Sequence, residues 1–271
     1  MKALINFIIL SLLFTEFVQG QEKAVCKVSY QFKHLRDTVT RYVHTEDMTL
    51  LIGKNMSVYS SQTKYIQDSI RTKAYADAEQ NGGTVNLGVV QPVTQESFFV
   101  SIPGKQIITQ TTFRRNIYLI HDPLEEIRWK ILSETKKIKG YTCQKATTYF
   151  KGRYYEVWFT AELPLSYGPW KLQGLPGVIL EATDNKNEVQ FFCTAVIKNP
   201  NQLIQIPTKG IKSTKADFNK MIAAYSDGAG TGSISGGGSD VRVEGLSLSG
   251  SSSSSRGRRG SGINNPIEKG N

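Results

Sequence analysis

The chain has 271 residues, a net charge of +10 and a hydrophobic fraction of 39%, which fits one large β domain or two small ones with a real core. Its three cysteines have no zinc-motif spacing and its three histidines have no ligand spacing, so the sequence predicts no metal and no cofactor. Basic residues are scattered apart from two short clusters at 136–139 and 256–259, which favours a solvated basic surface over attraction to anionic lipid, lipopolysaccharide or acidic glycan. Nucleic acid is not expected as a partner, because the N-terminal pattern described next indicates export.

The first twenty residues have the pattern of a secretory signal peptide. Lys2 is followed by a short apolar run and then by Val18-Gln19-Gly20, so cleavage is predicted before Gln21. An N-terminal membrane anchor is the alternative, but the run is short for a membrane span. We therefore expect an exported chain in the periplasm, at the outer membrane or secreted. We expect no transmembrane span in the mature chain, and outer-membrane or envelope proteins are the candidate partners.

Short strands are predicted for the first part of the mature chain. Apolar and polar residues alternate with a period of two over residues 25–34, which predicts a strand with one buried face. Further short strands are expected around Tyr42 and Val43, at 47–53 and at 57–61. Apolar residues then recur near helical spacing, which predicts a surface helix over 65–80, ended by Asn81-Gly82-Gly83.

The next part of the chain again predicts strands. Residues 89–94 and 97–102 have strand composition interrupted by Pro92, residues 107–120 predict one or two strands, and the alternation at 127–132 predicts another. A hairpin follows with arms at 141–150 and 153–161, and a second hairpin has arms at 178–183 and 189–197.

Between the two hairpins lies an irregular stretch, residues 162–177, which we call the central loop. Three prolines and three glycines within it exclude a helix or a long strand, while aliphatic and aromatic residues fill the gaps. This pattern predicts irregular backbone packed on a core. In its structural motif, Gly174-Leu175-Pro176-Gly177, the glycines are expected to serve positive φ or close packing, and the proline rigidity.

The chain ends in a helix and a low-complexity region. Apolar residues at helical spacing predict a helix over 214–225 that closes over the sheet, with Thr214 as N-cap and Asp217 three residues on. Residues 226–271 are predicted to be a Gly/Ser-rich tail, disordered over 226–262, with the short motif Asn264-Asn265-Pro266-Ile267-Glu268 near its end. The fold class expected for the domain, residues 21–225, is mainly β: an antiparallel curved sheet or partly open barrel with one or two helices.

Four aromatic residues flank the central loop and are the candidate binding residues: Tyr154, Trp158, Tyr167 and Trp170. If exposed together, they would make a flat platform for sugar rings or peptide side chains. Burial of the two tryptophans in the core is the alternative.

Carboxylates, histidines and cysteines are the other candidates for chemistry. The carboxylates Glu156, Glu162, Glu181 and Asp184 lie in or beside the hairpins, and a close pair would suit glycoside hydrolysis. Ordinary strand and turn positions explain Glu156, Glu181 and Asp184 better, so no catalytic residue is assigned. The histidines are expected on the surface or in turns. Cys143 and Cys193 are the expected disulfide pair, because both fall in predicted strands of one region.

The motif at residues 174–179, Gly-Leu-Pro-Gly-Val-Ile, resembles the one that names the GLPGLI family of exported Bacteroidota proteins, with Val178 in place of leucine. The resemblance extends to Trp129 and to residues 140–146, 152–153, 158–160, 168–169 and 264–268. It implies a signal peptide, an envelope or secreted location and a β-rich domain, with no established activity to carry over. Members encoded near outer-membrane transport receptors imply binding or accessory work.

The sequence therefore predicts an exported, non-catalytic binding or accessory module for a peptide, lipid or glycan. An envelope hydrolase that uses carboxylates near the central hairpins is the alternative. A surface-assembly role driven by the basic tail is a third hypothesis.

Overall fold

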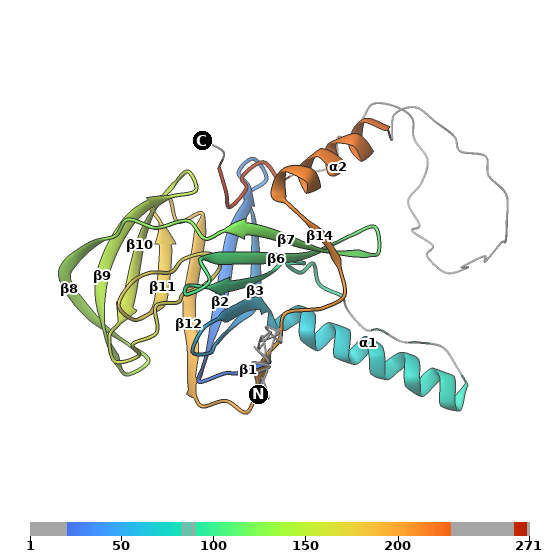
Figure 1. Cartoon of the computed structure of the whole chain (residues 1–271), viewed down its shortest axis with the longest axis horizontal. Coiled ribbons are helices and arrows are strands. Elements are labelled where there is room, and N and C mark those ends of the chain that lie inside the picture. Colours follow the sequence, from blue (N-terminus) through green and yellow to red (C-terminus); the bar gives the residue numbers. More distant parts are fainter. Residues whose placement is uncertain (1–20, 83–84, 86, 88–89, 229–262, 270–271) are drawn as a thin grey trace, which may run out of the picture.

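The computed structural model describes residues 21–82, 85, 87, 90–228 and 263–269 (Figure 1). The predicted signal peptide and residues 229–262 of the predicted tail lie outside the described residues.

The described chain is mostly strand. The strands are β1 (Glu22–Lys23), β2 (Cys26–Asp37), β3 (Tyr42–Ile52), β4 (Ser57–Ser61), β5 (Ser97–Ser101), β6 (Gln106–Phe113), β7 (Asn116–Pro123), β8 (Lys130–Ile138), β9 (Tyr141–Phe150), β10 (Arg153–Thr160), β11 (Val178–Asp184), β12 (Val189–Lys198), β13 (Leu203–Ile204) and β14 (Ile211–Ser213). The helices are α1 (Gln62–Asn81) and α2 (Lys215–Gly228).

Twelve strands form one sheet in the order β14-β7-β6-β5-β4-β3-β2-β12-β11-β10-β9-β8, while β1 and β13 form a separate ribbon. All pairs in the large sheet are antiparallel except β14 with β7. The sheet curves strongly, so that β6 and β7 cross β2 and β3 while β8 to β11 wrap around the other side (Figure 1). Since β14 and β8 are its two edges, the sheet stays open. The predicted mainly antiparallel, curved fold is confirmed.

The strand β2 shows how alternation builds this sheet. Tyr30, Phe32 and His34 are buried on its inner face, and the residues between them are half-buried on the other. The predicted strand at 25–34 is thus confirmed and continues to Asp37. The two short strands expected at 42–43 and 47–53 are one strand, β3, because β2 pairs with it along its whole length.

The central loop fills the inner side of the curved sheet. Leu163, Tyr167, Leu172 and Leu175 are each at most 4% exposed and belong to the main hydrophobic core. Its irregular backbone is tied internally, since the Gly174 amide donates to the Ser166 carbonyl at 2.9 Å. The predicted packed loop is confirmed, and burial of its apolar side chains is what fixes its shape.

Two predicted strands are not formed as expected. The strand predicted at 127–132 begins only at Lys130, because Ile127 is buried in the core and the Trp129 indole donates to the Gln173 carbonyl at 2.9 Å. Those apolar residues therefore hold the central loop. Residues 90–94 are not a strand either; the Thr94 amide donates to the Glu46 carboxylate at 3.0 Å.

The two helices differ in how they contact the sheet. Helix α1 is capped by Ser61, has no buried residue and projects away from the sheet (Figure 1). Helix α2 packs Phe218 edge-on against Tyr118 of β7, with ring centroids 5.1 Å apart. The predicted N-cap is confirmed, because the Asp217 amide donates to Thr214 Oγ1 at 3.2 Å. No helix among the described residues is both long and apolar enough to cross a membrane.

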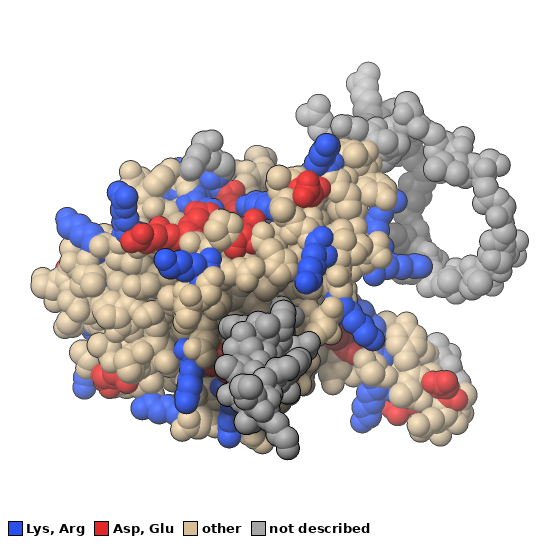
Figure 2. Space-filling model, in the orientation of Figure 1, with Lys and Arg blue, Asp and Glu red and all other residues tan. Residues whose placement is uncertain are grey.

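Charge is spread over the surface. On the face shown in Figure 2, Lys and Arg side chains stand apart from one another and do not merge into one basic area. Acidic side chains gather among basic ones on the upper part of this face.

Candidate ligand-binding cavity

A cavity of about 420 Å³ opens on the inner face of the sheet. It is bounded by β2 to β7, β12, the central loop, α2 and residues 263–269, which we call the C-terminal segment. Aromatic rings make its floor: Phe32 stacks on Phe191 with centroids 5.0 Å apart, and Tyr59 meets Phe191 edge-on at 6.2 Å. Its size lies within the range of about 300–1,000 Å³ that small-molecule sites occupy.

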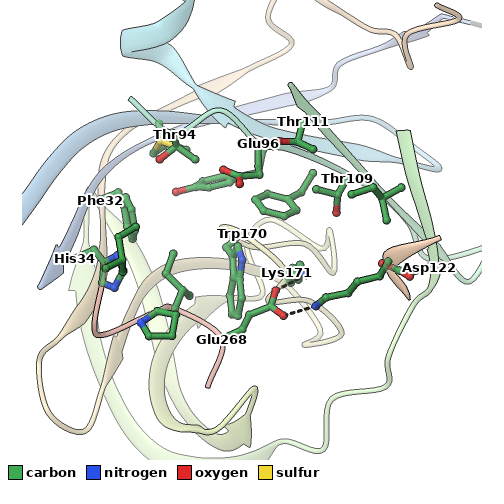
Figure 3. A pocket seen from close by; sticks show the side chains of 18 of the residues that line it. Phe32, His34, Thr94, Glu96, Thr109, Thr111, Asp122, Trp170, Lys171 and Glu268 are labelled. Atoms are coloured by element: carbon green, nitrogen blue, oxygen red, sulfur yellow. Dashed lines mark hydrogen bonds and ion pairs between the residues drawn. The ribbon is translucent and has the colours of Figure 1, made fainter. Parts of the chain in front are cut away.

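The rim of the cavity is polar. Thr109 and Thr111 stand two residues apart on β6 and therefore share a face of the sheet. Thr94 and Glu96 precede β5, and Asp122 lies near the end of β7. Hydroxyls and carboxylates thus border an aromatic floor, and Figure 3 shows them around one opening.

Trp170 lines the cavity from the central loop, next to Lys171. It is 4% exposed, with ring centroids 5.8 Å from Phe150 and 6.3 Å from Tyr155. Its backbone φ is 58°, in the left-handed region that costs an L-residue about 1–2 kcal/mol. Such strain persists where the surrounding packing enforces it, and it is frequent at binding sites.

A charged cluster closes the side of the cavity opposite Glu96 and Thr94 (Figure 3). Glu268 pairs with Lys171, and with Lys215 at 2.8 Å. Burial disfavours ionisation of Glu268, but the two ammonium groups outweigh it and hold the pKa of that carboxyl below its ordinary value. Glu268 is therefore a fixed negative charge.

Two cavity-lining residues carry a buried polar atom without a partner. Neither Tyr59 Oη nor Arg36 Nε has a hydrogen-bond partner among the described residues. Both atoms are buried, so these two groups are exceptions to the rule that buried polar atoms are hydrogen-bonded.

The four aromatic residues expected to form one platform are not brought together. Tyr154 is 62% exposed, and Trp158, on the same face of β10, carries Lys136 over its ring at 4.5 Å. Tyr167 and Trp170 are buried on the inner side. Only Trp170 lines the cavity, because alternation along β10 points the first two to the opposite face of the sheet.

The carboxylates considered for hydrolysis lie elsewhere. Glu181 pairs with Lys136, Glu156 with Lys145 at 2.8 Å, and Asp184 with Arg153 at 2.5 Å, while Glu162 accepts from the Thr142 amide. None of the four lines the cavity. Strand, turn and ion-pair roles account for each of them.

The expectation that the histidines lie on the surface is wrong for two of them. His34 and His44 are 2% and 3% exposed, because both occupy inward positions on β2 and β3. Each has a polar partner there: His34 Nε2 donates to the Asn265 carbonyl at 2.7 Å, and His44 Nε2 meets the Glu46 carboxylate at 2.8 Å.

The expected Cys143–Cys193 disulfide is not formed. Both residues are buried free thiols, as is Cys26. Cys143 lies on β9 and Cys193 on β12, and β10 and β11 separate them in the sheet. A disulfide requires Cα atoms within about 7 Å, which neighbouring strands can satisfy and more distant strands generally cannot.

The glycines of the motif at 174–177 have distinct geometries. Gly174 has φ +93°, and a Cβ placed on it would have only the Trp129 indole nitrogen nearby, at 3.8 Å. A Cβ on Gly177 would lie 2.0 Å from the Thr160 carbonyl oxygen. The first glycine serves a turn, and the second serves close contact between two backbone segments.

Arg153 is a residue that sequence reasoning did not single out for a site. It is 3% exposed on β10 and binds both Asp184 and the C-terminal segment. Its inward position in the β10 alternation was the available signal, since a charged residue at a buried strand position requires partners. No group of described residues has the composition to hold a metal ion.

Comparison with known proteins adds a family and a fold. The family model described as "N-glycanase peptide, N-terminal domain" matches residues 55–218, more than half of the chain. No curated protein matches the chain. Two solved structures of PNGF-II, in different space groups, resemble it with TM-scores of 0.50 and 0.49 at 16% and 18% identity, covering 74% and 75% of this chain. Each match covers 33% of the PNGF-II chain, so this chain spans about a third of that length. At these identities the likeness shows the fold alone, and the resemblance to the GLPGLI family stays a prediction.

Proposed function

The chain belongs to the family of the N-glycanase peptide N-terminal domain, and on that premise we propose that it is an exported, non-catalytic module that binds a glycan in its cavity. The family's name associates it with proteins that act on N-linked glycans, which selects the glycan from the three ligand classes the sequence left open. The observation that carries the proposal is the cavity itself: an aromatic floor, Trp170 in a strained backbone, and a rim of hydroxyls and carboxylates.

Each part of the cavity suits a sugar residue. Phe32, Tyr59 and Trp170 provide the flat apolar surfaces that stack on the C–H faces of a pyranose ring. Thr109, Glu96 and their rim neighbours supply acceptors and donors for sugar hydroxyls.

Glycan binding is tested with the full chain on an array of N-linked and bacterial glycans, followed by calorimetry on each hit. The variants Glu96→Gln and Asp122→Asn alter the rim without touching the aromatic floor, and each is expected to weaken binding by about tenfold through loss of a charged hydrogen bond. Glu156→Gln is the matched control, because this carboxylate lies on the outer face of β10. Absence of saturable binding to any glycan, or equal weakening by the control, would remove the proposal.

A hydrolase is the second candidate, and the carboxylates around the cavity favour it. Glu96, Asp122 and Glu268 all line the cavity, and glycoside hydrolysis uses a pair of carboxyl groups. Glu268 is held ionised by two lysines, so a proton donor would have to be Glu96 or Asp122. Incubation with a labelled glycopeptide and mass spectrometry separates the two functions. Glycan release that disappears in Glu96→Gln or Asp122→Asn would establish the enzyme.

The proposed export and envelope location have their own test. Fractionation of cells that express the chain with its own leader should place it outside the cytoplasm, shortened to begin at Gln21. Cross-linking in the envelope fraction then identifies outer-membrane or envelope partners. Retention in the cytoplasm at full length would refute this part of the proposal.

A further inference from the structure

Almost every residue of the C-terminal segment contacts the domain. The residues that it contacts form a groove, whose walls and floor are described below. Asn264 uses both ends of its amide: Oδ1 accepts from the Thr38 amide at 2.9 Å, and Nδ2 donates to Asp37 Oδ1 at 2.8 Å. Asn265 Nδ2 donates to the Leu35 carbonyl at 2.6 Å. The side-chain amides of Asn264 and Asn265 make these hydrogen bonds, so the contacts depend on the sequence of the segment.

A β-bulge in β2 creates one wall of this groove. The pairing of β2 with β3 shifts register between Leu35 and Asp37, so Arg36 has no partner on β3. The Arg36 carbonyl instead accepts from the Asn265 amide at 3.2 Å, and on the same strand His34 Nε2 donates to the Asn265 carbonyl. The bulge thus leaves backbone groups of β2 free to bind the C-terminal segment.

Arg153 forms the floor of the groove. Two of its N–H groups bind Asp184 and Glu188, at 2.5 and 2.8 Å. The other three point to the segment: Nη2 donates to Asn265 Oδ1 and to the Pro266 carbonyl, both at 2.7 Å, and Nε donates to the Ile267 carbonyl at 3.0 Å. All five donors of a buried guanidinium are therefore satisfied only when the segment is present.

The remaining residues of the segment add apolar and charged contacts. Ile267 packs against the main core, and Glu268 pairs with Lys171 and Lys215. The Lys269 amide donates to the Lys151 carbonyl at 3.0 Å. One apolar anchor, one carboxylate anchor and a row of amide contacts are the features of a peptide-binding site.

From these contacts we infer that the groove between the bulge of β2, Arg153 and Lys171 is a sequence-specific peptide site. Its ligand is an Asn-Asn-Pro-Ile-Glu segment in the bent conformation that the chain's own residues 264–268 adopt. On the segment side, every contact described above is made by residues 264–269. We therefore expect a free peptide of this sequence to bind the same groove. This inference does not depend on the glycan proposal.

Occupancy of the groove also shapes the neighbouring cavity. Ile263, Pro266, Ile267 and Glu268 line the cavity, so release of the segment removes one of its walls. Release would also leave Lys171 and Lys215 without their shared carboxylate.

The test uses the full chain with the recognition sequence of a site-specific protease in place of residues 251–255. After cleavage, the fragment that carries residues 256–271 should co-elute with the domain in gel filtration. An excess of a synthetic peptide of residues 262–271 should displace it, whereas a scrambled peptide should not. Fluorescence anisotropy of the labelled peptide then gives its affinity.

Peptide variants keep the test independent of folding. Asn265→Ala in the peptide removes contacts to Arg153 and Leu35 and should weaken binding about 10–100-fold, as for a hydrogen bond to a charged group. Lys269→Ala keeps the backbone contact to Lys151 and removes only the ion pair of Lys269 with Glu188, at 3.2 Å. Because the lysine is partly exposed, the affinity should change by less than about threefold.

Three outcomes would overturn the inference. In the first, the cleaved fragment elutes separately, the domain keeps its melting curve, and the synthetic peptide shows no saturable binding. The Asn265→Ala peptide could bind as well as the original. If cleavage unfolds the domain, added peptide must restore the native transition, and failure to restore it counts against the site.

Discussion

Gly177 and Gly174 stand three residues apart in the central loop, and each excludes a side chain for a different reason. A Cβ on Gly177 would overlap the Thr160 carbonyl oxygen at 2.0 Å and its carbon at 2.6 Å. Backbone atoms cannot move aside as the end of a side chain can. At Gly174 the space is open, and only the φ of +93° opposes a larger residue.

Alanine substitution should therefore separate the two positions. We expect Gly177→Ala to lower the free energy of unfolding by about 3 kcal/mol or more, because two backbone segments must part. Gly174→Ala should cost about 1–2 kcal/mol, the strain of a positive φ at an L-residue. Urea denaturation of both variants measures the difference. Equal losses would show that steric contact at Gly177 is not what keeps this position glycine.

His34 makes stability depend on pH. Burial disfavours its charged form and, with the nearby charges of Arg36, Arg153 and His44, lowers its pKa from 6.5 to about 4, although the hydrogen bond to the Asn265 carbonyl opposes the shift. Between pH 6.5 and pH 4, His34 is protonated in the unfolded chain but stays neutral in the folded protein. Stability from this group is thus complete above pH 6.5 and is lost as the pH falls toward 4.

The size of this effect can be isolated with one variant. His34→Gln keeps an N–H donor for the Asn265 carbonyl but cannot titrate. The difference in unfolding free energy between wild type and variant should shift by up to about 3 kcal/mol between pH 7.5 and pH 4, with the wild type losing more. Urea denaturation across this range measures it. Parallel pH profiles for the two proteins would contradict the assignment to His34.

Among the elements, the two helices begin with the same kind of cap in different surroundings. Thr214 caps α2 at the surface, where Oγ1 accepts from the Asp217 amide and donates to the Asp217 carboxylate at 2.7 Å. Ser61 caps α1 by accepting from the Lys64 amide at 2.8 Å, and its hydroxyl also donates to Glu46. Glu46 is 3% exposed, so its donors matter more.

The two caps should differ in cost when removed. Thr214→Ala should destabilise by about 1 kcal/mol, the usual value for an N-cap. Ser61→Ala should cost about 2–3 kcal/mol, because a buried carboxylate also loses a donor. Thermal unfolding gives the totals, and amide exchange along each helix shows where protection falls. A larger loss for Thr214→Ala would contradict the role given to Glu46.

Sequence reasoning succeeded where the signal was local to an element. The alternation along β2 predicts a strand because one of its faces is buried. Thr214 and Asp217 predict the start of α2 because the two residues, three positions apart, form the N-cap hydrogen bond. It failed at residues 127–129, where the alternating apolar residues hold the central loop and do not form a strand. The Trp129 contact with Gln173 spans 44 positions, and no local pattern records it.

The candidate site was only partly predictable for the same reason. Prolines and glycines of the central loop indicate a packed corner, and Trp170 within it does line the cavity. The partners of Trp170 come from distant strands, and the Arg153 groove joins residues 112 positions apart. Which aromatic side chains share a face depends on strand order and curvature, which the alternation within one strand does not specify.

At the scale of the whole molecule, the three cysteines lie on strands between the middle of the sheet and its β8 edge. Cys26 lies on β2, Cys193 on β12 and Cys143 on β9, and all three are at most 5% exposed. Burial raises the pKa of Cys26 and Cys143 to about 11 and that of Cys193 to about 12, so almost no thiolate is present at neutral pH. Reaction of any of them therefore requires the sheet to open.

Thiol labelling should accordingly report unfolding of the whole sheet. In the native protein at pH 8, we expect a thiol-specific reagent to react with the three cysteines together and slowly, at the rate of opening. In denaturant without reductant, mass spectrometry should count three labelled thiols. A count of one would mean that two cysteines are paired, and Cys26→Ala would then show whether Cys143 and Cys193 form that pair. Rapid native labelling of a single cysteine would instead show that its part of the sheet opens independently of the rest.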